Sequence, residues 1–339
     1  METHDSPHLM VIIDTEEEFD WSQPFSRENT ATESVKHQGL AQKIFEKHGV
    51  VPTYVLDYCV VSKAENCRFF KELSSAGACE IGAHLHPWVT PPHDETVSNP
   101  ANSFHGNLAK PLEREKIRRL SHMIREHLDI RPEIFKAGRY GIGPNTAGLL
   151  KEAGYKIDCS YVPYTCFSHD HGPSFLGTPD QPFWLDRDRT LLEIPVTKYF
   201  IGALSGFGPK IQAVFDHPGA VRFKVPGLLR RMGIERSVLS PEGVGLPELI
   251  RLIRAMLKNG KRVFTLTYHS PSLLPGSTPY VNTQKDLDAF LACIDGVLDF
   301  FIHEAGGTPI PVSRFYRLAR QKKEALPVFT RPPDTVSNG

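Results

Sequence analysis

The sequence lacks an excess of charge of either sign: its 339 residues include 39 lysines and arginines and 39 aspartates and glutamates. Proteins that attract nucleic acid over long distances carry a strong positive charge, so the composition indicates no nucleic-acid partner. The sequence also has no stretch approaching the roughly 18 consecutive apolar residues that a membrane-spanning helix needs. We therefore expect no transmembrane segment.

Cysteines are few and stand apart from one another. The chain has six, and no two of them form a CxxC pair, which excludes a zinc site of four cysteines with the usual spacing. The first eight residues contain no lysine or arginine, and the apolar run Leu9–Ile13 is too short for the core of a signal peptide. The sequence therefore predicts a cytoplasmic protein with reduced thiols.

Short apolar runs alternate along the chain with amphipathic stretches of helical length. The predicted strands are Leu9–Ile13, Val50–Leu56, Cys79–Ala83, Glu133–Ala137, Lys156–Ser160, Thr190–Pro195, Arg262–Tyr268 and Pro309–Val312. The predicted helices are Thr32–His48, Asn66–Ala76, Pro111–Leu128, Asn145–Glu152 and Leu287–Glu304. Strands separated by helix-length segments indicate βα units and a mainly parallel sheet.

About six to eight such units are typical of an α/β barrel, complete or slightly irregular, which we place at residues 8–320. Residues 205–241 are rich in glycine, proline, lysine and arginine and are interpreted as an insertion in this barrel. We expect residues 321–339 to be a loose C-terminal tail. In barrels of this kind the chemistry lies where the strands end, and the polar clusters of this sequence follow predicted strands.

Acidic side chains follow the first predicted strand. Residues two apart in a strand share a face, so Asp14 and Glu16 would project to the same side. Two neighbouring carboxylates repel each other unless a cation or a proton lies between them. The pattern predicts a cation site, although a solvated acidic loop explains it equally well because Glu17, Glu18 and Asp20 follow.

Two histidines follow the third predicted strand. By the same alternation His84 and His86 point to one side, as two imidazole ligands of one metal ion do. Together with an acidic strand end they favour a zinc-type site over two surface histidines. Trp88 could form an apolar wall or a surface on which a sugar stacks, and His93 is a weaker candidate ligand in a loop.

Basic residues and one further histidine complete the candidate site. Lys136 and Arg139 lie at and just behind the fourth strand, where a buried cation would keep a neighbouring carboxylate ionised and aimed. In isolation these two would be ordinary surface residues. His269 follows a later strand and precedes a loop rich in proline, serine and glycine, which is a suitable setting for a general acid.

The ordered set of these motifs resembles that of the polysaccharide deacetylases, the NodB-homology enzymes of carbohydrate esterase family 4. The resemblance covers about residues 8–315 and rests on Asp14-Thr-Glu16, Glu80-Ile-Gly-Ala-His84, Phe135-Lys-Ala-Gly-Arg-Tyr-Gly141, Asp158-Cys-Ser160 and Leu266-Thr-Tyr-His269. The segments His84-Leu-His-Pro-Trp88 and His269-Ser-Pro-Ser-Leu-Leu-Pro-Gly276 are similar to those of the WalW-like subgroup. The resemblance implies a distorted (β/α)7-type barrel, one divalent metal ion and hydrolysis of N-acetyl (or O-acetyl) groups on a glycan.

The resemblance also implies roles for single residues at the metal. Asp14 matches the catalytic base and His84 the first metal histidine, while Glu16 takes the place of the metal carboxylate. The usual adjacent Asp-Asp pair is Asp-Thr-Glu here, which leaves Glu17 open as the ligand. The family's second metal histidine comes four residues after the first, where this chain has a tryptophan, and His86 is its substitute from the strand geometry.

The implied metal is zinc, with Co, Mn or Ni as alternatives. Such an ion lowers the pKa of its bound water from 15.7 toward about 7 and polarises an amide carbonyl. The family's motif arginine aligns with either Lys136 or Arg139. The resemblance implies that Asp14, held in place by one of these two residues, would take the proton of the attacking water. His269 matches the catalytic histidine and would protonate the leaving amine. Tyr140 is expected to contact the substrate, and its backbone N–H or that of Arg139 would stabilise the oxyanion.

Two rival functions remain open. The same barrel and metal could hydrolyse a non-sugar C–N amide bond, or the chain could be a catalytically inactive glycan-binding protein, since two motifs are degenerate. The expected substrate is an acetylated carbohydrate, in the cell a nucleotide-linked, lipid-linked or short precursor glycan. The insertion contains the apolar and basic run Val225-Pro-Gly-Leu-Leu-Arg-Arg-Met232. A lid, a weak membrane-surface contact and a plain solvated insertion are all open interpretations of it.

Overall fold

One curled sheet forms the centre of the molecule. A computed structural model of the chain describes residues 6–97, 99–322 and 325–334. The order across the sheet is β10-β1-β2-β3-β4-β5-β7-β6, with β11 against the start of β1. These pairs are parallel except β6–β7. The strands are β1 His8–Thr15, β2 Thr53–Leu56, β3 Glu80–Leu85, β4 Ile134–Ala137, β5 Ile157–Asp158, β6 Phe183–Trp184, β7 Leu192–Glu193, β10 Val263–His269 and β11 Thr308–Pro309.

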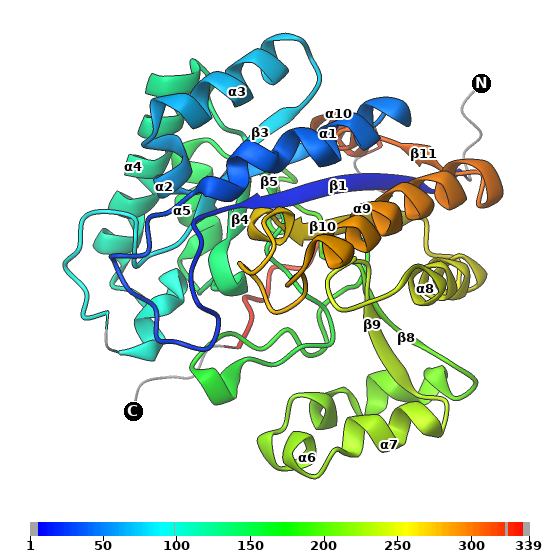
Figure 1. The fold of residues 1–339 in the computed structure, drawn as a ribbon. Coiled ribbons are helices and arrows are strands. Elements are labelled where there is room, and N and C mark those ends of the chain that lie inside the picture. The colour runs from blue at the N-terminus through cyan, green and yellow to red at the C-terminus, as the bar shows by residue number, and fades with distance from the viewer. Residues whose placement is uncertain (1–5, 98, 323–324, 335–339) are drawn as a thin grey trace.

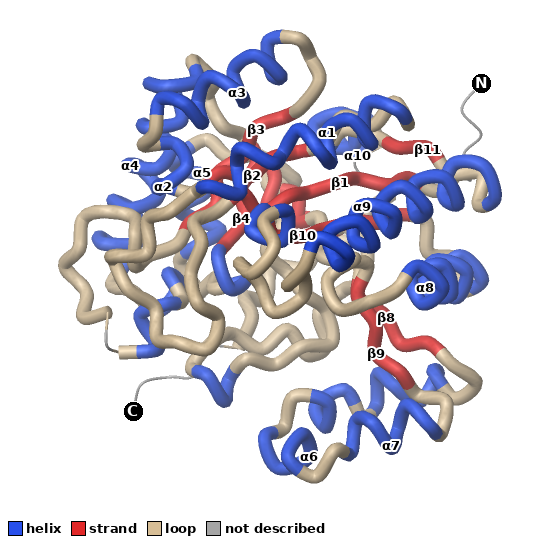
Figure 2. The backbone as a smooth tube through the Cα atoms, viewed as in Figure 1, coloured by secondary structure: helices blue, strands red, loops and turns tan. Residues whose placement is uncertain are grey.

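Helices surround this sheet, as Figures 1 and 2 show, with α1 and α9 running beside β1. The helices of the barrel are α1 Gln38–Lys47, α2 Tyr58–Val61, α3 Ala64–Ser75, α4 Lys110–Leu128, α5 Thr146–Ala153, α8 Leu246–Lys258, α9 Gln284–Asp299 and α10 Val312–Gln321. The arrangement confirms the predicted α/β fold with a distorted (β/α)-type barrel. Among the described residues, no helix combines the length and the hydropathy that crossing a membrane requires.

Side chains along β1 alternate between the two faces of the sheet, and each face belongs to a different apolar cluster. Leu9, Val11 and Ile13 belong to the large apolar cluster that includes the surrounding helices. Met10 and Ile12 belong to a second cluster, which includes residues of the neighbouring strands and of α10. Because side chains two apart share a face, the next residue on the second face, Asp14, continues this inner row.

The barrel is distorted where β10 meets the far side of the sheet. In the described part of the chain β10 and β6 are the two ends of the main strand order, so no strand ladder closes the ring. Two threonines bridge the gap instead: the backbone N–H of Thr197 donates to Oγ1 of Thr265, and that of Thr265 to Oγ1 of Thr197, each at 2.7 Å. These side-chain bonds attach β10, which carries a candidate catalytic residue, to the segment that enters the insertion.

The insertion forms a separate hairpin. Strands β8 Lys198–Ile201 and β9 Glu235–Val238 pair antiparallel in a sheet of their own. The chain between them includes the short helices α6 Pro218–Arg222 and α7 Val225–Arg231. In Figures 1 and 2 this part projects away from the barrel.

Part of the C-terminal segment that we expected to be loose is attached to the barrel. The backbone N–H of Trp184 in β6 donates to the carbonyl of Pro327, and that of Phe329 donates back to Trp184, both at 2.9 Å. The N–H of Ser174 likewise donates to the carbonyl of Asp334 at 2.8 Å. The structure differs here from the expectation because β6 is an edge strand whose free backbone groups accept another chain segment. Residues 323–324 and 335–339 of that predicted tail lie outside the described residues.

Candidate active site and metal centre

The inner row of side chains on β1 ends in a carboxylate. Asp14 follows Met10 and Ile12 on the same face and is 3% exposed. β10 pairs with β1 in parallel, and Asp14 lies opposite His269, the last residue of β10. Oδ2 of Asp14 is 3.7 Å from Nε2 of His269. Two residues that the sequence predicted as catalytic thus lie side by side at the carboxyl ends of neighbouring strands.

The three predicted metal ligands come together in the same region. Glu16 follows β1, His84 belongs to β3, and His86 comes directly after β3. Nε2 of His84 is 3.2 Å, and Nε2 of His86 3.3 Å, from the same oxygen, Oε2 of Glu16. All three side chains are buried, and their ligand atoms lie within 4.8 Å of one another. This spacing suits three ligands of one ion.

The hydrogen bonds of His84 test whether these residues suit a cation. Nδ1 of His84 faces the carbonyl oxygen of Lys136 at 3.1 Å, so in a neutral ring this nitrogen carries the proton. Burial lowers the pKa of His84 and so favours the neutral ring. The lone pair of Nε2 then points at the carboxylate of Glu16. Two lone pairs at this distance repel each other unless a cation lies between them, so the pair fits a cation.

Glu16 has a further property that fits an ion. Its Oε1 is buried and has no hydrogen-bond partner among the described residues, which is unfavourable for a carboxylate oxygen unless something else binds it. Burial would raise the pKa of Glu16, but the positive charge of His269 and the neighbouring imidazoles of His84 and His86 together hold the pKa well below its usual value. The carboxylate therefore stays ionised. Two imidazole nitrogens and one carboxylate form a donor set typical of zinc.

Glu17, which the sequence left open as a ligand, holds His86 instead. Oε2 of Glu17 is 2.8 Å from Nδ1 of His86, and Oε1 accepts the indole N–H of Trp88 at 2.7 Å. Glu17 and His86 also form a second close group of ligand atoms with Asp57, but hydrogen bonds account for its contacts, since Asp57 accepts the backbone N–H of Glu17 at 3.1 Å. A carboxylate behind a ligating histidine fixes which ring nitrogen faces the metal. Glu17 therefore leaves Nε2 of His86 facing Glu16.

Trp88 does not form the predicted sugar-stacking surface. Its side chain is buried at 2% exposure, and its ring is stacked between those of Phe25 and His86, with centroids 4.2 and 4.3 Å away. The reason is its indole N–H, whose bond to Glu17 draws the ring beneath the site. His93, the weaker candidate ligand, is exposed and takes no part in the ligand group.

Lys136 and Arg139, alternatives in the sequence, have different partners. Nζ of Lys136 donates to Oδ1 of Asp14 at 2.6 Å and to Oγ1 of Thr267 at 3.0 Å, with the lysine side chain only 1% exposed. Arg139 instead pairs with Asp170, and its guanidinium lies over two aromatic rings, Phe104 and Phe25. Only the lysine is in a position to hold the predicted base.

Tyr140 lies beside Lys136. Its ring centroid is 5.6 Å from Nζ of Lys136, and burial raises the pKa of its hydroxyl well above the usual value. Arg139 and Tyr140 both have positive φ angles, 52° and 57°, a conformation that costs free energy in non-glycine residues and tends to occur at functional sites.

A glutamate that the sequence analysis missed holds His269. Oε2 of Glu242 is 2.8 Å from Nδ1 of His269, and Oε1 accepts the backbone N–H of the same residue at 3.0 Å. Burial lowers the pKa of His269, but the charges of Glu242 and Glu16 outweigh burial and raise the pKa to about 9. The imidazole is therefore protonated at neutral pH, with Nε2 toward Asp14. Nothing in the sequence between Ser240 and Gly243 marks this residue, because its partner is far away in the chain.

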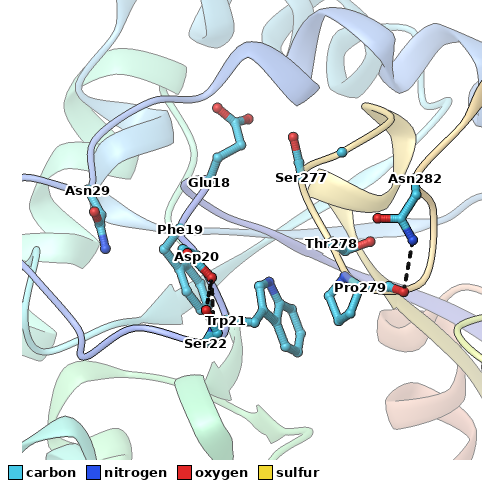
Figure 3. A pocket seen from close by; sticks show the side chains of 11 residues that line it. Glu18, Phe19, Asp20, Trp21, Ser22, Asn29, Ser277, Thr278, Pro279 and Asn282 are labelled. Atoms are coloured by element: carbon cyan, nitrogen blue, oxygen red, sulfur yellow. Dashed lines mark hydrogen bonds between the residues drawn. The ribbon is translucent and has the colours of Figure 1, made fainter.

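A cavity of about 730 Å³ is lined by the segment that follows β1 and by the loop beyond β10 (Figure 3). It is lined by Glu18, Phe19, Asp20, Trp21, Ser22, Asn29, Gly276, Ser277, Thr278, Pro279 and Asn282. The ring of Trp21 connects the cavity to the site, since it packs edge-on against His269, with centroids 5.1 Å apart, and against Tyr280 at 5.7 Å. Trp21 is 37% and Tyr280 40% exposed. These two rings, which the sequence analysis did not select, offer the apolar faces that we had expected of Trp88.

Solved structures show where this fold occurs elsewhere. A protein from Mycobacterium smegmatis described as a putative polysaccharide deacetylase is similar, with a TM-score of 0.55 and 17% identity over 98% of this chain and 96% of that one. The PuuE allantoinase has a TM-score of 0.53 and 16% identity, covering 94% and 92% of the two chains. A protein from Pseudomonas aeruginosa PAO1 described as a probable polysaccharide deacetylase has a TM-score of 0.50 and 15% identity, covering 93% and 91% of the two chains. No protein-family model and no curated protein matches the sequence. The chain has the fold of the polysaccharide deacetylases.

Proposed function

We propose that the chain is a metal-dependent hydrolase of the polysaccharide deacetylase family, which removes N-acetyl or O-acetyl groups from a carbohydrate. One observation carries the proposal: the ligand group of Glu16, His84 and His86 lies together with Asp14 and His269 at the carboxyl ends of parallel strands. The fold shared with polysaccharide deacetylases supports it. The WalW-like subgroup stays a prediction from the sequence.

In this proposal Glu16, His84 and His86 hold one divalent ion, zinc or in its place Co, Mn or Ni. When bound, such an ion supplies an activated water and polarises the carbonyl that is attacked. The remaining steps belong to the side chains of the protein.

Asp14 is the proposed base. Its Oδ1 is occupied by the ammonium group of Lys136, which fixes the carboxylate and offsets its buried charge. Oδ2 receives no hydrogen bond from Lys136 and is the oxygen free to accept the proton of the attacking water. The contact with Lys136 supports this residue, rather than Arg139, as the one that positions the base.

His269 is the proposed acid. It is protonated at neutral pH, since its pKa is raised to about 9, and Glu242 holds its Nδ1. Nε2 is then the atom that donates a proton to the leaving nitrogen, because an amine anion cannot depart without one. Tyr140 is the proposed substrate contact, and its backbone N–H or that of Arg139 is the proposed oxyanion donor.

The substrate approaches, in this proposal, through the cavity beside Trp21. An exposed tryptophan with Tyr280 next to it suits the apolar face of a sugar ring. All six cysteines are free thiols, which supports the predicted cytoplasmic location and an intracellular precursor glycan as substrate. Cell fractionation tests that location.

A second candidate reaction is hydrolysis of a non-sugar C–N amide bond, favoured by the similarity in fold to an allantoinase. The experiment that separates the two is a screen of metal-loaded protein on N- and O-acetylated sugars and on non-sugar amides. Acetate release from the sugars supports the deacetylase, and turnover of non-sugar amides alone supports the alternative. A folded, metal-loaded protein that hydrolyses none of them is the outcome expected of an inactive glycan-binding protein.

A further inference from the structure

The hairpin insertion carries its own small core. Phe200, Phe215 and Ile234 are buried together, with Ile211 and Leu229 of the insertion and Tyr164 of the barrel packed against them. The two strands that bear residues 202–234 form a sheet separate from that of the barrel, and Figure 1 shows this part standing apart from it. The outer side chains of the insertion are therefore not needed to bury its core.

Those outer side chains include a concentration of exposed apolar residues. Among the described residues, ten large hydrophobic side chains are exposed, and six of them lie within residues 202–234: Leu204, Phe207, Val221, Phe223, Leu228 and Met232. Phe223 is 80% exposed. Single exposed apolar residues are ordinary on protein surfaces, whereas a group of them indicates an interaction site.

The same segment concentrates positive charge in a chain whose net charge is zero. Residues 202–234 contain five lysines and arginines but one acidic residue, Asp216, and Asp216 is already paired with Arg236 at 2.5 Å. Arg230 pairs with Glu235 and Glu248. In the described part of the chain no ion pair engages the other four, which are Lys210, Arg222, Lys224 and Arg231.

These apolar and basic residues are interleaved. Val221, Arg222, Phe223 and Lys224 are consecutive and exposed, and so are Arg231, the last residue of α7, and Met232, which follows it. We call the six exposed apolar residues and the four unpaired basic residues the insertion surface. A nucleic acid would use the basic residues but leave the aliphatic ones in water, whereas the boundary of an anionic bilayer accepts both kinds.

We propose that the insertion surface docks on an anionic lipid bilayer, with the apolar side chains entering the acyl boundary and the basic groups at the lipid phosphates. Lysine and arginine suit this position because their long stems stay in the apolar layer while the charged ends reach the headgroups. The proposal does not depend on the reaction proposed above, since none of these residues belongs to the candidate active site. It assigns the protein a position at a membrane surface.

The test is co-sedimentation of the full chain with lipid vesicles. Wild-type protein should bind vesicles of phosphatidylglycerol and phosphatidylcholine in equal parts, bind pure phosphatidylcholine vesicles much less, and be released as salt screens the charges. The double variant Arg222→Glu/Lys224→Glu and the single variant Phe223→Ser should each weaken binding to the anionic vesicles by at least about tenfold.

Two matched variants control for general effects of charge and hydropathy. Arg68 and Lys71 on α3 are exposed basic residues three apart, so Arg68→Glu/Lys71→Glu changes the net charge by the same amount elsewhere. Leu40 is an exposed apolar residue on α1, and Leu40→Ser matches Phe223→Ser. Both should bind vesicles like the wild type, and all four variants should keep its thermal unfolding midpoint.

Failure of the wild type to bind anionic vesicles would overturn the proposal. An equal loss of binding in Arg68→Glu/Lys71→Glu would also overturn it, because the weaker binding would then follow from the net charge of the protein and not from the insertion surface. Sedimentation velocity supplies a third outcome: self-association that Phe223→Ser abolishes, without vesicle binding, would assign the insertion surface to a second copy of the chain instead.

Discussion

Asp14 and His269 are partners in the register of two neighbouring parallel strands, and their side chains lie 3.7 Å apart at the carboxyl end of the sheet. Each has its own charged partner, Lys136 for the aspartate and Glu242 for the histidine. The proposed proton acceptor and the proposed proton donor are thereby held side by side, and neither belongs to the ligand group.

This separation predicts how variants of the pair behave. Asp14→Asn and His269→Ala should each lower kcat by about 100-fold or more, the scale of a positioned proton-transfer group. Both should keep most of the bound metal, because neither residue is among the three proposed ligands. Steady-state kinetics and metal analysis on the same samples check this, and a folded His269→Ala enzyme with near-normal kcat would reduce His269 to a structural residue.

The raised pKa of His269 predicts the alkaline limb of the pH profile. A general acid works in its protonated form, so kcat/KM should fall as pH rises through the pKa of His269, which the charge of Glu242 holds above the usual value for histidine. Glu242→Gln keeps a hydrogen-bond acceptor but removes the charge, so the limb should move to lower pH. An unchanged limb in that variant would exclude Glu242 as the residue that sets it.

The strand pattern was readable from the sequence because the parallel strands are buried runs, and each of the eight predicted strands overlaps a strand of the structure. The helix α8 was missed although Leu249, Leu252, Ile253 and Met256 have helical spacing. The hairpin strands β8 and β9 and the short β6 could not be found, since none of them is a long apolar run.

Some features of the candidate site could likewise be predicted from the sequence, and others could not. Alternation along a strand was enough to place His84 and His86 on one side, because that periodicity is a local property of the backbone. The choice between Lys136 and Arg139, and the burial of Trp88, depend on partners far away in the sequence. Glu242 had no local signal for the same reason, since it meets His269 only through the folded chain.

The ligand group predicts metal binding. His84→Ala and His86→Ala should each lose most of the zinc that the wild type holds, measured by mass spectrometry of the purified protein, whereas His93→Ala should keep it because His93 is exposed and outside the group. Glu17→Gln should weaken zinc affinity by about 10- to 100-fold, as expected of a carboxylate behind a ligating histidine. Greater loss in His93→Ala than in His86→Ala would contradict the ligand assignment.

The close packing around Gly138 predicts that a side chain at this position would also weaken zinc binding. A Cβ atom at this position would lie 2.8 Å from Nε2 of His86 and 2.7 Å from the carbonyl oxygen of Leu85. Gly138→Ala should therefore displace the imidazole and weaken zinc binding. Gly148 in α5 has nothing within 4 Å of such an atom, so Gly148→Ala is the control, and equal zinc titrations for the two variants would show that the close contact has no consequence.

Lys136 predicts a loss of stability as well as of activity. Its ammonium group is buried against Asp14, and removal of one partner from a buried ion pair costs about 3–5 kcal/mol because the other charge stays buried alone. Lys136→Met should lower the free energy of unfolding in urea by about that amount. The double variant Lys136→Met/Asp14→Leu should recover part of it, and an additive loss would show that the two residues are not coupled.

Acetate release is the most direct measurement of the proposed metal-dependent deacetylase activity. Metal-loaded protein is incubated with a panel of N- and O-acetylated sugars, then stripped with a chelator, dialysed and reloaded with zinc. The wild type should release acetate from at least one sugar, lose that activity on stripping and regain it with zinc, whereas His84→Ala should not regain it. Release that survives complete removal of the metal, or none from any acetylated sugar by folded, zinc-loaded protein, would contradict the proposed activity.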